Sequence, residues 1–232
     1  MPGIGAGDFI VVLGESGCGK TTLLNLLAGF LTPTRGDVYI DDTRITGPHF
    51  SRSLIFQKPL LLPWLSVKEN IAFGCKLRGD TAQLSGRVEK YITMIGLKGF
   101  EQSSPDSLSL GMAQRVAIAR SLIGKPEVLL LDEPFTALDF NTRSHLQDEL
   151  VKLWKQLHFT AIFVTHSIAE ALKVGQKIII LSSRPARVLH FIDLNSDIPR
   201  DLNDEKIASL KLDIQERFES MKKRQQEKTD GK

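Results

Sequence analysis

One short segment of the sequence arranges glycines, a lysine and a hydroxyl group in an order suited to binding phosphate. It reads GESGCGKT over residues 14–21 and matches the spacing G-x-x-x-x-G-K-[ST]. Its glycines let the backbone turn closely and direct N–H groups at phosphate oxygens. Lys20 is expected to reach the β- and γ-phosphates of a nucleotide, and the Thr21 hydroxyl to bind Mg²⁺. The residues expected to contact the nucleotide here are Gly14, Glu15, Ser16, Gly17, Cys18, Gly19, Lys20, Thr21 and Thr22.

The context of this segment decides between two interpretations. The alternative is an ordinary glycine turn before a helix. The apolar run at 9–13 precedes the loop and a helical pattern at 20–30 follows it, which favours the phosphate site. Cys18 is expected to contribute its backbone, with a redox role as the alternative.

Two adjacent carboxylates follow a second apolar run, in VLLLDEP at 128–134. A buried parallel strand would place them at the carboxyl edge of the sheet, where open α/β folds bind ligands. Asp132 is expected to hold Mg²⁺, and Glu133 to polarise an attacking water molecule. Taken alone, the pair also fits a plain boundary between strand and loop; beside the phosphate loop, the catalytic interpretation is favoured.

Two further polar residues end short apolar runs. His166 closes FVTH at 163–166, and it is expected to contact the γ-phosphate or orient the water. Gln57 follows the run in LIFQKP at 54–59, and we expect it to take part in catalysis and in binding Mg²⁺. A single histidine after a strand is more often structural, so the assignment of His166 depends on its neighbours.

The pattern of apolar residues predicts an α/β fold. Runs at 9–13, 128–131, 161–164 and 177–181 lack polar alternation, which is typical of strands buried on both faces of a parallel sheet. Helical patterns lie between them, one at 20–30 and another from about 139 to 157. The stretch from 65 to 123 is almost wholly helical, so we expect a helical lobe inserted between two strands. A further helix is expected at about 204–228, with apolar positions at Ile207, Leu210, Ile214, Phe218 and Met221.

Composition excludes several classes of protein. The 30 Lys and Arg against 27 Asp and Glu leave a net charge of +3, too balanced to argue for a nucleic-acid partner. The start lacks the pattern of a secretory signal, and no apolar run approaches the roughly 20 residues that span a bilayer. The two cysteines form no metal-binding cluster. These features predict a soluble, intracellular protein.

The motifs together resemble those of the ATP-binding cassette (ABC) ATPases. The phosphate loop, IFQ, LSLGMAQR (108–115), LLLDEP, ALD (137–139) and TH follow the order and approximate spacing of that family over nearly the whole chain. The resemblance implies a P-loop NTPase (RecA-like) core with a mostly parallel sheet, at about 1–64 and 124–200. It also implies a helical subdomain at about 65–123 and a C-terminal helix and tail at about 201–232, all within one ABC ATPase domain.

The resemblance further implies ATP and Mg²⁺ as ligands and a homodimer that encloses two ATP molecules. In this family the loop before the helix at 110 touches the γ-phosphate held by the other subunit. Ser109 and Gly111 occupy the contacting positions, and Asp139 is also expected at the nucleotide. Leu110 departs from the usual glycine, so its side chain is expected to point away from the phosphate, or the loop to lie farther back.

Two segments narrow the resemblance to importers. LLLPWLSVKENIAFG (60–74) and LSSRPARV (181–188) are similar to the ATPase subunits of taurine, alkanesulfonate and nitrate importers. This implies integral membrane permease subunits, indirectly a periplasmic or extracellular substrate-binding protein, and a peripheral place on the cytoplasmic face of the inner membrane. Trp64 is expected at the permease interface, with a core position as the alternative. The rival functions are a soluble ABC protein of DNA maintenance and a degenerate subunit that binds nucleotide with little hydrolysis.

A second departure concerns the adenine. ABC ATPases usually carry an aromatic residue upstream of the phosphate loop that stacks on the base. Only thirteen residues precede Gly14, and the one aromatic among them, Phe9, starts the strand into the loop. The N-terminal antiparallel strands are therefore expected to be truncated, with an unpaired sheet edge.

The missing ring predicts weak discrimination between nucleotides. Stacking on an aromatic side chain contributes about 1–3 kcal/mol per base, so ATP affinity is expected to be roughly 5- to 150-fold lower than in a relative that has the ring. GTP should bind nearly as well as ATP, because both share the triphosphate. Measuring both affinities before and after grafting an aromatic-bearing N-terminal segment tests this expectation. Tight, selective ATP binding by the native chain would show that another residue supplies the platform.

Overall fold

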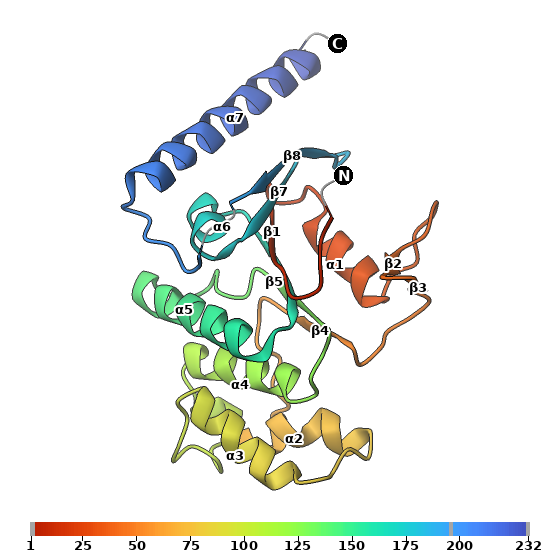
Figure 1. Ribbon diagram of the computed structural model, residues 1–232, viewed down its shortest axis with the longest axis vertical. Coiled ribbons are helices and arrows are strands. Elements are labelled where there is room, and N and C mark those ends of the chain that lie inside the picture. Colours follow the sequence, from red (N-terminus) through yellow and green to blue (C-terminus); the bar gives the residue numbers. More distant parts are fainter. Residues whose placement is uncertain (1–2, 195–196, 231–232) are drawn as a thin grey trace.

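A six-stranded sheet forms the middle of the molecule, with helices on both faces (Figure 1). The computed structural model describes residues 3–194 and 197–230, with side chains described up to residue 219. The strand order is β4-β5-β6-β1-β7-β8. In chain order, the strands of this sheet are β1 (Phe9–Leu13), β4 (Arg52–Ile55), β5 (Val128–Asp132), β6 (Thr160–Thr165), β7 (Lys177–Leu181) and β8 (Val188–Asp193).

The strands predicted from unbroken apolar runs are confirmed as the parallel centre of this sheet. β1 pairs in parallel with β6 and β7, and β5 pairs in parallel with β4 and β6. Every residue of β1 is buried, which explains why its sequence shows no polar alternation. β8, which the sequence did not reveal, is the antiparallel edge strand beside β7.

Two apolar layers hold helices against the two faces of the sheet. Val12 of β1 packs in one cluster with Leu24 of α1 (Lys20–Ala28). Val11, the adjacent residue, points to the other face and joins the cluster that contains α5 (Phe140–Leu157) and α6 (Ile168–Val174). Successive side chains of a strand alternate between faces, so one strand serves both layers. α1 and α5 confirm predicted helices, whereas α6 was not predicted.

Three helices lie between β4 and β5, as the expected inserted lobe requires. They are α2 (Val67–Leu77), α3 (Leu84–Met94) and α4 (Leu110–Leu122). The expectation of an almost wholly helical stretch from 65 to 123 is wrong for residues 95–109. That segment holds only a 3₁₀ turn at Pro105–Ser107, because Gly96 and Gly99 adopt positive φ and Pro105 interrupts helical bonding.

A small hairpin stands apart from the main sheet. It pairs β2 (Tyr39–Ile40) with β3 (Thr43–Arg44), and within the described residues no third strand joins it. Tyr39 on this hairpin is 55% exposed. The edges of the main sheet are β4 and β8, while β1 is paired on both sides. β1, the first described strand, therefore lies inside the main sheet, and the expected unpaired edge is not found at this strand.

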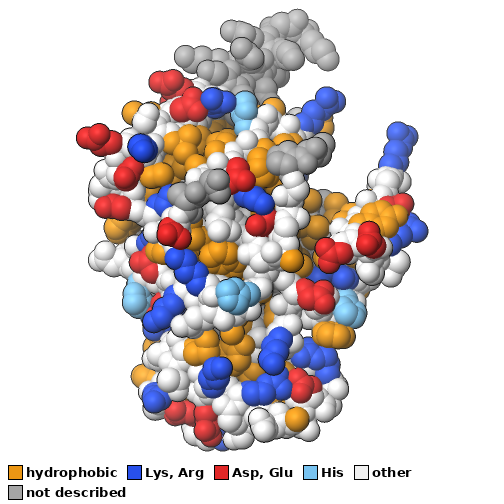
Figure 2. All heavy atoms as spheres, in the orientation of Figure 1, with side chains coloured by type: hydrophobic (Ala, Val, Ile, Leu, Met, Phe, Trp, Pro, Cys, Tyr) orange, Lys and Arg blue, Asp and Glu red, His pale blue; other side chains and the backbone are white. Residues whose placement is uncertain are grey.

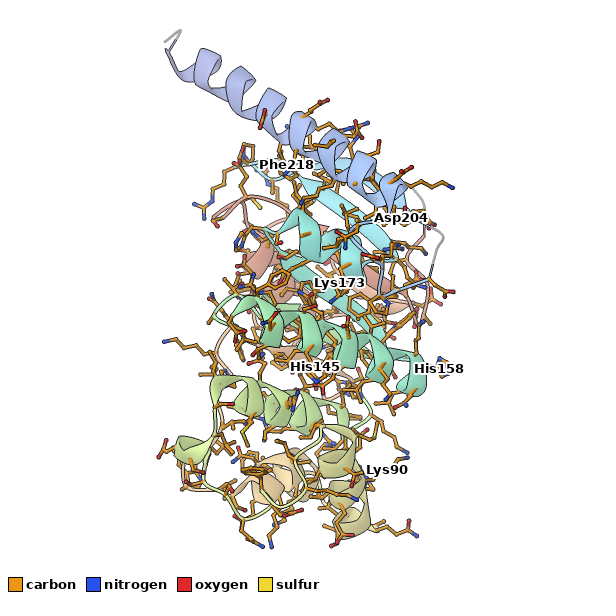
Figure 3. The ribbon with its side chains drawn as sticks, turned by 90° about the vertical axis from the view of Figure 1, so that its left-hand side faces the viewer. Lys90, His145, His158, Lys173, Asp204 and Phe218 are labelled. Atoms are coloured by element: carbon orange, nitrogen blue, oxygen red, sulfur yellow. The ribbon has the colours of Figure 1, made fainter. Side chains whose placement is uncertain are left out.

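The predicted C-terminal helix is confirmed as α7 (Glu205–Asp230). It lies beyond β8 at one end of the molecule (Figures 1 and 3). Ile214 is fully buried and Phe218 packs against the core cluster. The predicted apolar position at Met221 lies outside the described side chains.

The C-terminal cap of α1 lies very close to the backbone of Gly47, and substitutions can test this contact. Gly29 caps α1 with φ +82°, and a Cβ there would lie 2.2 Å from the carbonyl oxygen of Gly47. Gly36 has a similar φ of +74° but nothing within 4 Å of such a Cβ. Gly36→Ala should cost about 1–2 kcal/mol from backbone strain alone. Gly29→Ala should cost about 1–3 kcal/mol more, because the clash adds to the strain. Equal losses in urea denaturation of the two variants would contradict this close approach.

Candidate functional site

The carboxyl ends of three neighbouring parallel strands meet at one edge of the sheet. In the register of β1 and β6, Leu13 lies opposite Thr165, and in that of β5 and β6, Asp132 lies opposite Val164. The loop from Gly14, the Asp132–Glu133 pair and His166 therefore begin side by side. The predicted juxtaposition at this edge is confirmed by the register.

The loop between β1 and α1 wraps around the start of the helix. The Gly14 N–H donates to the Thr165 carbonyl at 3.3 Å, which ties the beginning of the loop to β6. Gly17 and Gly19 have φ of +79° and +115°, a region where other side chains are strained. The first turn of α1 carries no acidic residue. Its N–H groups and the positive end of the helix dipole thus face the loop, and no carboxylate of the first turn itself competes for them.

Lys20 reaches back across this loop although it is 5% exposed. Its Nζ donates to the carbonyl oxygens of Gly14 and Glu15 at 2.9 Å each, and lies 3.4 Å from Oε1 of Glu133. An unpaired buried ammonium would be costly, so these oxygens fix its position. The cation is thereby placed between the phosphate loop and the carboxylate.

The other side chains of the loop point in two directions. Ser16, Thr21 and Thr22 are exposed. Cys18 is 3% exposed and packs in the cluster of Val12 and Leu24. Its thiol faces the protein interior, so only its backbone is presented to a ligand.

Thr21 and Asp132 bring two oxygen atoms together at the mouth of the loop. The Thr21 hydroxyl donates to Oδ1 of Asp132 at 3.2 Å. Burial raises the pKa of the Asp132 carboxyl, and the hydrogen bond from Thr21 partly opposes this. A hydroxyl and a carboxylate are the hard oxygen donors that Mg²⁺ prefers, so the residues present fit this ion.

Gln57 lies at the same edge but outside this contact. β4 pairs with β5 so that Ile55 is opposite Leu131, and Gln57 follows two residues beyond β4. Its side chain is exposed. Among the described residues no hydrogen bond joins it to Thr21 or Asp132, so its expected part in Mg²⁺ binding remains a prediction.

Glu133 is the centre of the polar cluster. Its Oε2 lies 2.9 Å from Nδ1 of His166 and accepts a hydrogen bond from the Thr136 hydroxyl at 3.3 Å. Its backbone has φ +45°, a strained value for a residue with a side chain. The N–H of Glu133 donates to the Val164 carbonyl at 3.1 Å, which holds that conformation. Thr136, which no sequence motif indicated, completes the orientation of this carboxylate.

Ser109, Gly111 and Asp139 form a second group, at the starts of α4 and α5. The Ser109 hydroxyl accepts from the Met112 N–H at 3.3 Å, and Asp139 Oδ1 accepts from the Thr142 N–H at 3.0 Å. A Cβ at Gly111 would lie 2.9 Å from Cγ2 of Thr142, so glycine lets α4 approach α5. These residues make no hydrogen bond to Lys20 or Glu133 within the described part of the chain.

Leu110 is the first residue of α4 and is 42% exposed. Its side chain therefore does not fill the interior between α4 and α5. This exposure agrees with the expectation that it points away from a phosphate contacted by Ser109 and Gly111, and that expectation remains a prediction.

Comparisons with known proteins agree with this arrangement. The family model described as "ABC transporter" matches residues 3–136. The aliphatic sulfonates import ATP-binding protein SsuB of Bacillus cereus is 44% identical over 213 residues, which are 92% of this chain and 84% of that protein. The taurine import ATP-binding protein TauB of Roseobacter denitrificans is 45% identical, with 83% of this chain and 74% of that protein covered.

A solved structure shares both fold and sequence features with the chain. It is a dimer of the ATP-binding cassette MJ0796 in a post-hydrolysis state, bound to ADP and Pi. The TM-score is 0.71 at 30% sequence identity, covering 84% of this chain and 89% of that one.

Two aspartates of this site should affect stability with opposite signs. The pKa of Asp132 is raised by burial, so its favourable contribution is present at low pH and lost as pH rises through the folded pKa. The pKa of Asp139 is lowered, chiefly by the Thr142 N–H, so its contribution is present at neutral pH and lost as pH falls.

Asp132→Asn should therefore raise the free energy of unfolding at pH 7, and the gain should shrink as pH approaches the ordinary aspartate value. Asp139→Asn is the matched control, and it should lower stability at pH 7 by a margin that also shrinks toward acid. Urea denaturation at several pH values between about 4 and 7 measures both. Loss of stability at pH 7 in Asp132→Asn would show that burial of this carboxylate carries no cost.

Proposed function

The chain belongs to the ABC transporter family and is an ATPase that binds ATP, and we propose that it drives the import of a small anionic solute across a membrane. The observation that carries the catalytic part is the Glu133 carboxylate, held between Lys20 and His166 at 3.4 and 2.9 Å. Residues that bind phosphate, position water and carry charge converge there on one sheet edge.

Each residue of the cluster has a proposed step. The Gly14–Thr21 loop and the start of α1 grip the phosphates with N–H groups. Lys20 exchanges its contact with Glu133 for the β- and γ-phosphates and neutralises their charge. Glu133 accepts a proton from the attacking water, and His166 keeps the carboxylate and the water in line with the γ-phosphate. The products are ADP and inorganic phosphate.

Mg²⁺ is proposed as the accompanying ion. Thr21 and Asp132 would hold it, directly or through water, and Gln57 at the end of β4 would reach the same ion. When bound, Mg²⁺ neutralises charge on the phosphate oxygens during transfer.

A pair of chains is the proposed working unit. The family and the dimeric MJ0796 cassette support a dimer. Ser109, Gly111 and the N-terminus of α4 are proposed to touch the γ-phosphate bound by the partner, and Asp139 to lie near it. Ser109 is exposed at a helix start, where an approaching anion is favoured.

The surface around α2 is the proposed contact with a permease. Trp64 is 73% exposed, which rules out the alternative of a core position, and Leu60 and Leu77 are 55% and 72% exposed. Large apolar side chains that remain exposed are candidates for an interaction surface. We propose that membrane subunits cover them and hold the chain at the cytoplasmic face of the inner membrane. No described helix of the chain is both long and apolar enough to span a bilayer.

The transported solute is proposed from the relatives. SsuB and TauB are named for the import of aliphatic sulfonates and of taurine, so we propose a sulfonate-type anion, delivered by a substrate-binding protein. Nitrate is proposed as well, from the resemblance carried by residues 60–74 and 181–188. Uptake of labelled taurine, an alkanesulfonate and nitrate into vesicles that carry the chain and its permease tests this class. ATP-dependent uptake of none of them would refute it.

The rival functions fit the structure less well. The segment between β4 and β5 holds helices of 11, 11 and 13 residues, too short for the long coiled coil of a DNA-maintenance ABC protein. Positive and negative side chains are interspersed over much of the face shown in Figure 2, and the net charge of +3 is too balanced to argue for a nucleic-acid partner. The intact contacts of Glu133 argue against a degenerate subunit.

Glu133→Gln tests the proposed chemistry. The amide cannot accept the proton of water, so turnover should fall by roughly 10²–10⁴ while ATP still binds. An ATP-bound dimer should then accumulate in gel filtration. Glu127→Gln is the matched control, because Glu127 is exposed at the opposite end of the same strand, and it should hydrolyse ATP normally. Unchanged hydrolysis in Glu133→Gln would remove this residue from the mechanism.

A further inference from the structure

Glu170 on α6 is a buried carboxylate that none of the roles above uses. It is 6% exposed. One carboxylate oxygen accepts from Nε2 of Gln147 on α5 at 3.0 Å, and the other accepts from the hydroxyl of Thr165 at the end of β6. A buried carboxylate is costly unless its hydrogen bonds are made, so these two donors define its place.

The Thr165 hydroxyl also makes a hydrogen bond to the turn that carries His166. Having donated to Glu170, it accepts from the Ser167 N–H at 3.0 Å. The Ser167 hydroxyl in turn accepts from the Glu170 N–H at 3.3 Å and caps α6. Thr165, which precedes His166, is thus bonded directly to the Glu170 carboxylate. Ser167, which follows His166, is bonded to that carboxylate through the Thr165 hydroxyl.

This arrangement differs from an ordinary helix cap. The pattern Ser-x-x-Glu at 167–170 predicts a capping box, in which the glutamate side chain accepts from the backbone N–H of the serine. Here the Glu170 side chain turns away to Thr165 and Gln147, and the Thr165 hydroxyl takes the Ser167 N–H in its place. The Glu170 carboxylate is therefore bonded to the carboxyl end of β6, beside the site, and not to the start of its own helix.

The same strand end also touches the phosphate loop. The Thr165 carbonyl accepts from the Gly14 N–H at 3.3 Å. Its side chain and backbone thus link Glu170 to the two parts of the site that hold His166 and the first glycine of the loop. Gln147 adds a link to α5, the helix that Asp139 caps.

We propose that Glu170 is a positioning residue for ATP hydrolysis. It fixes Thr165 and Ser167 so that His166 keeps its hydrogen bond to Glu133 in line with the γ-phosphate. The inference rests on the proposed function, because that function gives His166 and Glu133 their roles. Glu170 does not touch the reacting atoms; it acts through His166.

A second link between α5 and α6 provides a control. Lys173 lies one turn after Glu170 on α6, beside α5 (Figure 3). Its Nζ donates to the Ser144 hydroxyl at 2.7 Å and to the Ser144 carbonyl at 3.0 Å. Lys173→Met breaks this link without touching Thr165, so it reports what the α5–α6 contact alone contributes.

The test compares turnover with ATP affinity in the full chain. Glu170→Ala and Thr165→Val should each lower turnover by about 10- to 100-fold, the effect of displacing a reacting group by about 1 Å. ATP affinity should change less than about threefold, since 1.4 kcal/mol would already be tenfold. Glu170→Gln should retain more turnover than Glu170→Ala, because its amide oxygen still accepts from Thr165. Lys173→Met should hydrolyse ATP like the wild type.

A double-mutant cycle separates positioning from general stability. If Glu170 acts through His166, Glu170→Ala should have no further effect in a His166→Ala background. Additive losses, or an equal loss in Lys173→Met, would overturn the inference. A wild-type rate in both Glu170→Ala and Thr165→Val, with His166→Ala strongly slowed, would refute this inference alone. A wild-type rate in His166→Ala would refute the proposed role of His166 and this inference with it.

Discussion

The buried ammonium of Lys20 constrains the conformation of the loop before it and the position of Glu133. Removing a charged group from water costs several kcal/mol unless nearby groups compensate. The carbonyl oxygens of Gly14 and Glu15 do so only because the loop turns back on itself, which requires the positive φ of Gly17 and Gly19. The carboxylate of Glu133, 3.4 Å from the ammonium, supplies the compensating negative charge. The loop conformation, the lysine and the carboxylate are therefore one electrostatic unit, and in the proposed function phosphate oxygens take over the contacts of the lysine.

The sheet makes this unit possible because parallel strands end at one edge. Glu133 enters it with a strained backbone at φ +45°, and strain of this kind persists only where surrounding contacts over-determine it. The Val164 carbonyl, Thr136 and His166 are those contacts. Burial also raises the pKa of the adjacent Asp132. Both acidic residues thus hold energetically unfavourable positions, which a purely structural strand end would have no reason to keep.

The sequence predicted the parts of this protein whose signals are local. Unbroken apolar runs located β1, β5, β6 and β7, because strands buried on both faces leave no room for polar residues. β8 escaped because it is a half-solvated edge strand, with Val188 61% exposed. α6 has seven residues, too few to show a helical period. Glu170 escaped for another reason: its partner Gln147 lies 23 residues away, and only tertiary packing brings them together.

The two helix starts at Ser109 and Asp139 show why a family motif needs its chemistry checked residue by residue. The Ser109 hydroxyl accepts from the Met112 N–H and keeps its own proton to donate, so capping α4 is compatible with contacting a phosphate oxygen. Asp139 has a lowered pKa and stays ionised at neutral pH. An ionised carboxylate only accepts hydrogen bonds and repels phosphate. Any influence of Asp139 on the phosphates must therefore pass through water, a cation or the position of α5, whereas a direct contact with the nucleotide would have to be with a donor such as a ribose hydroxyl.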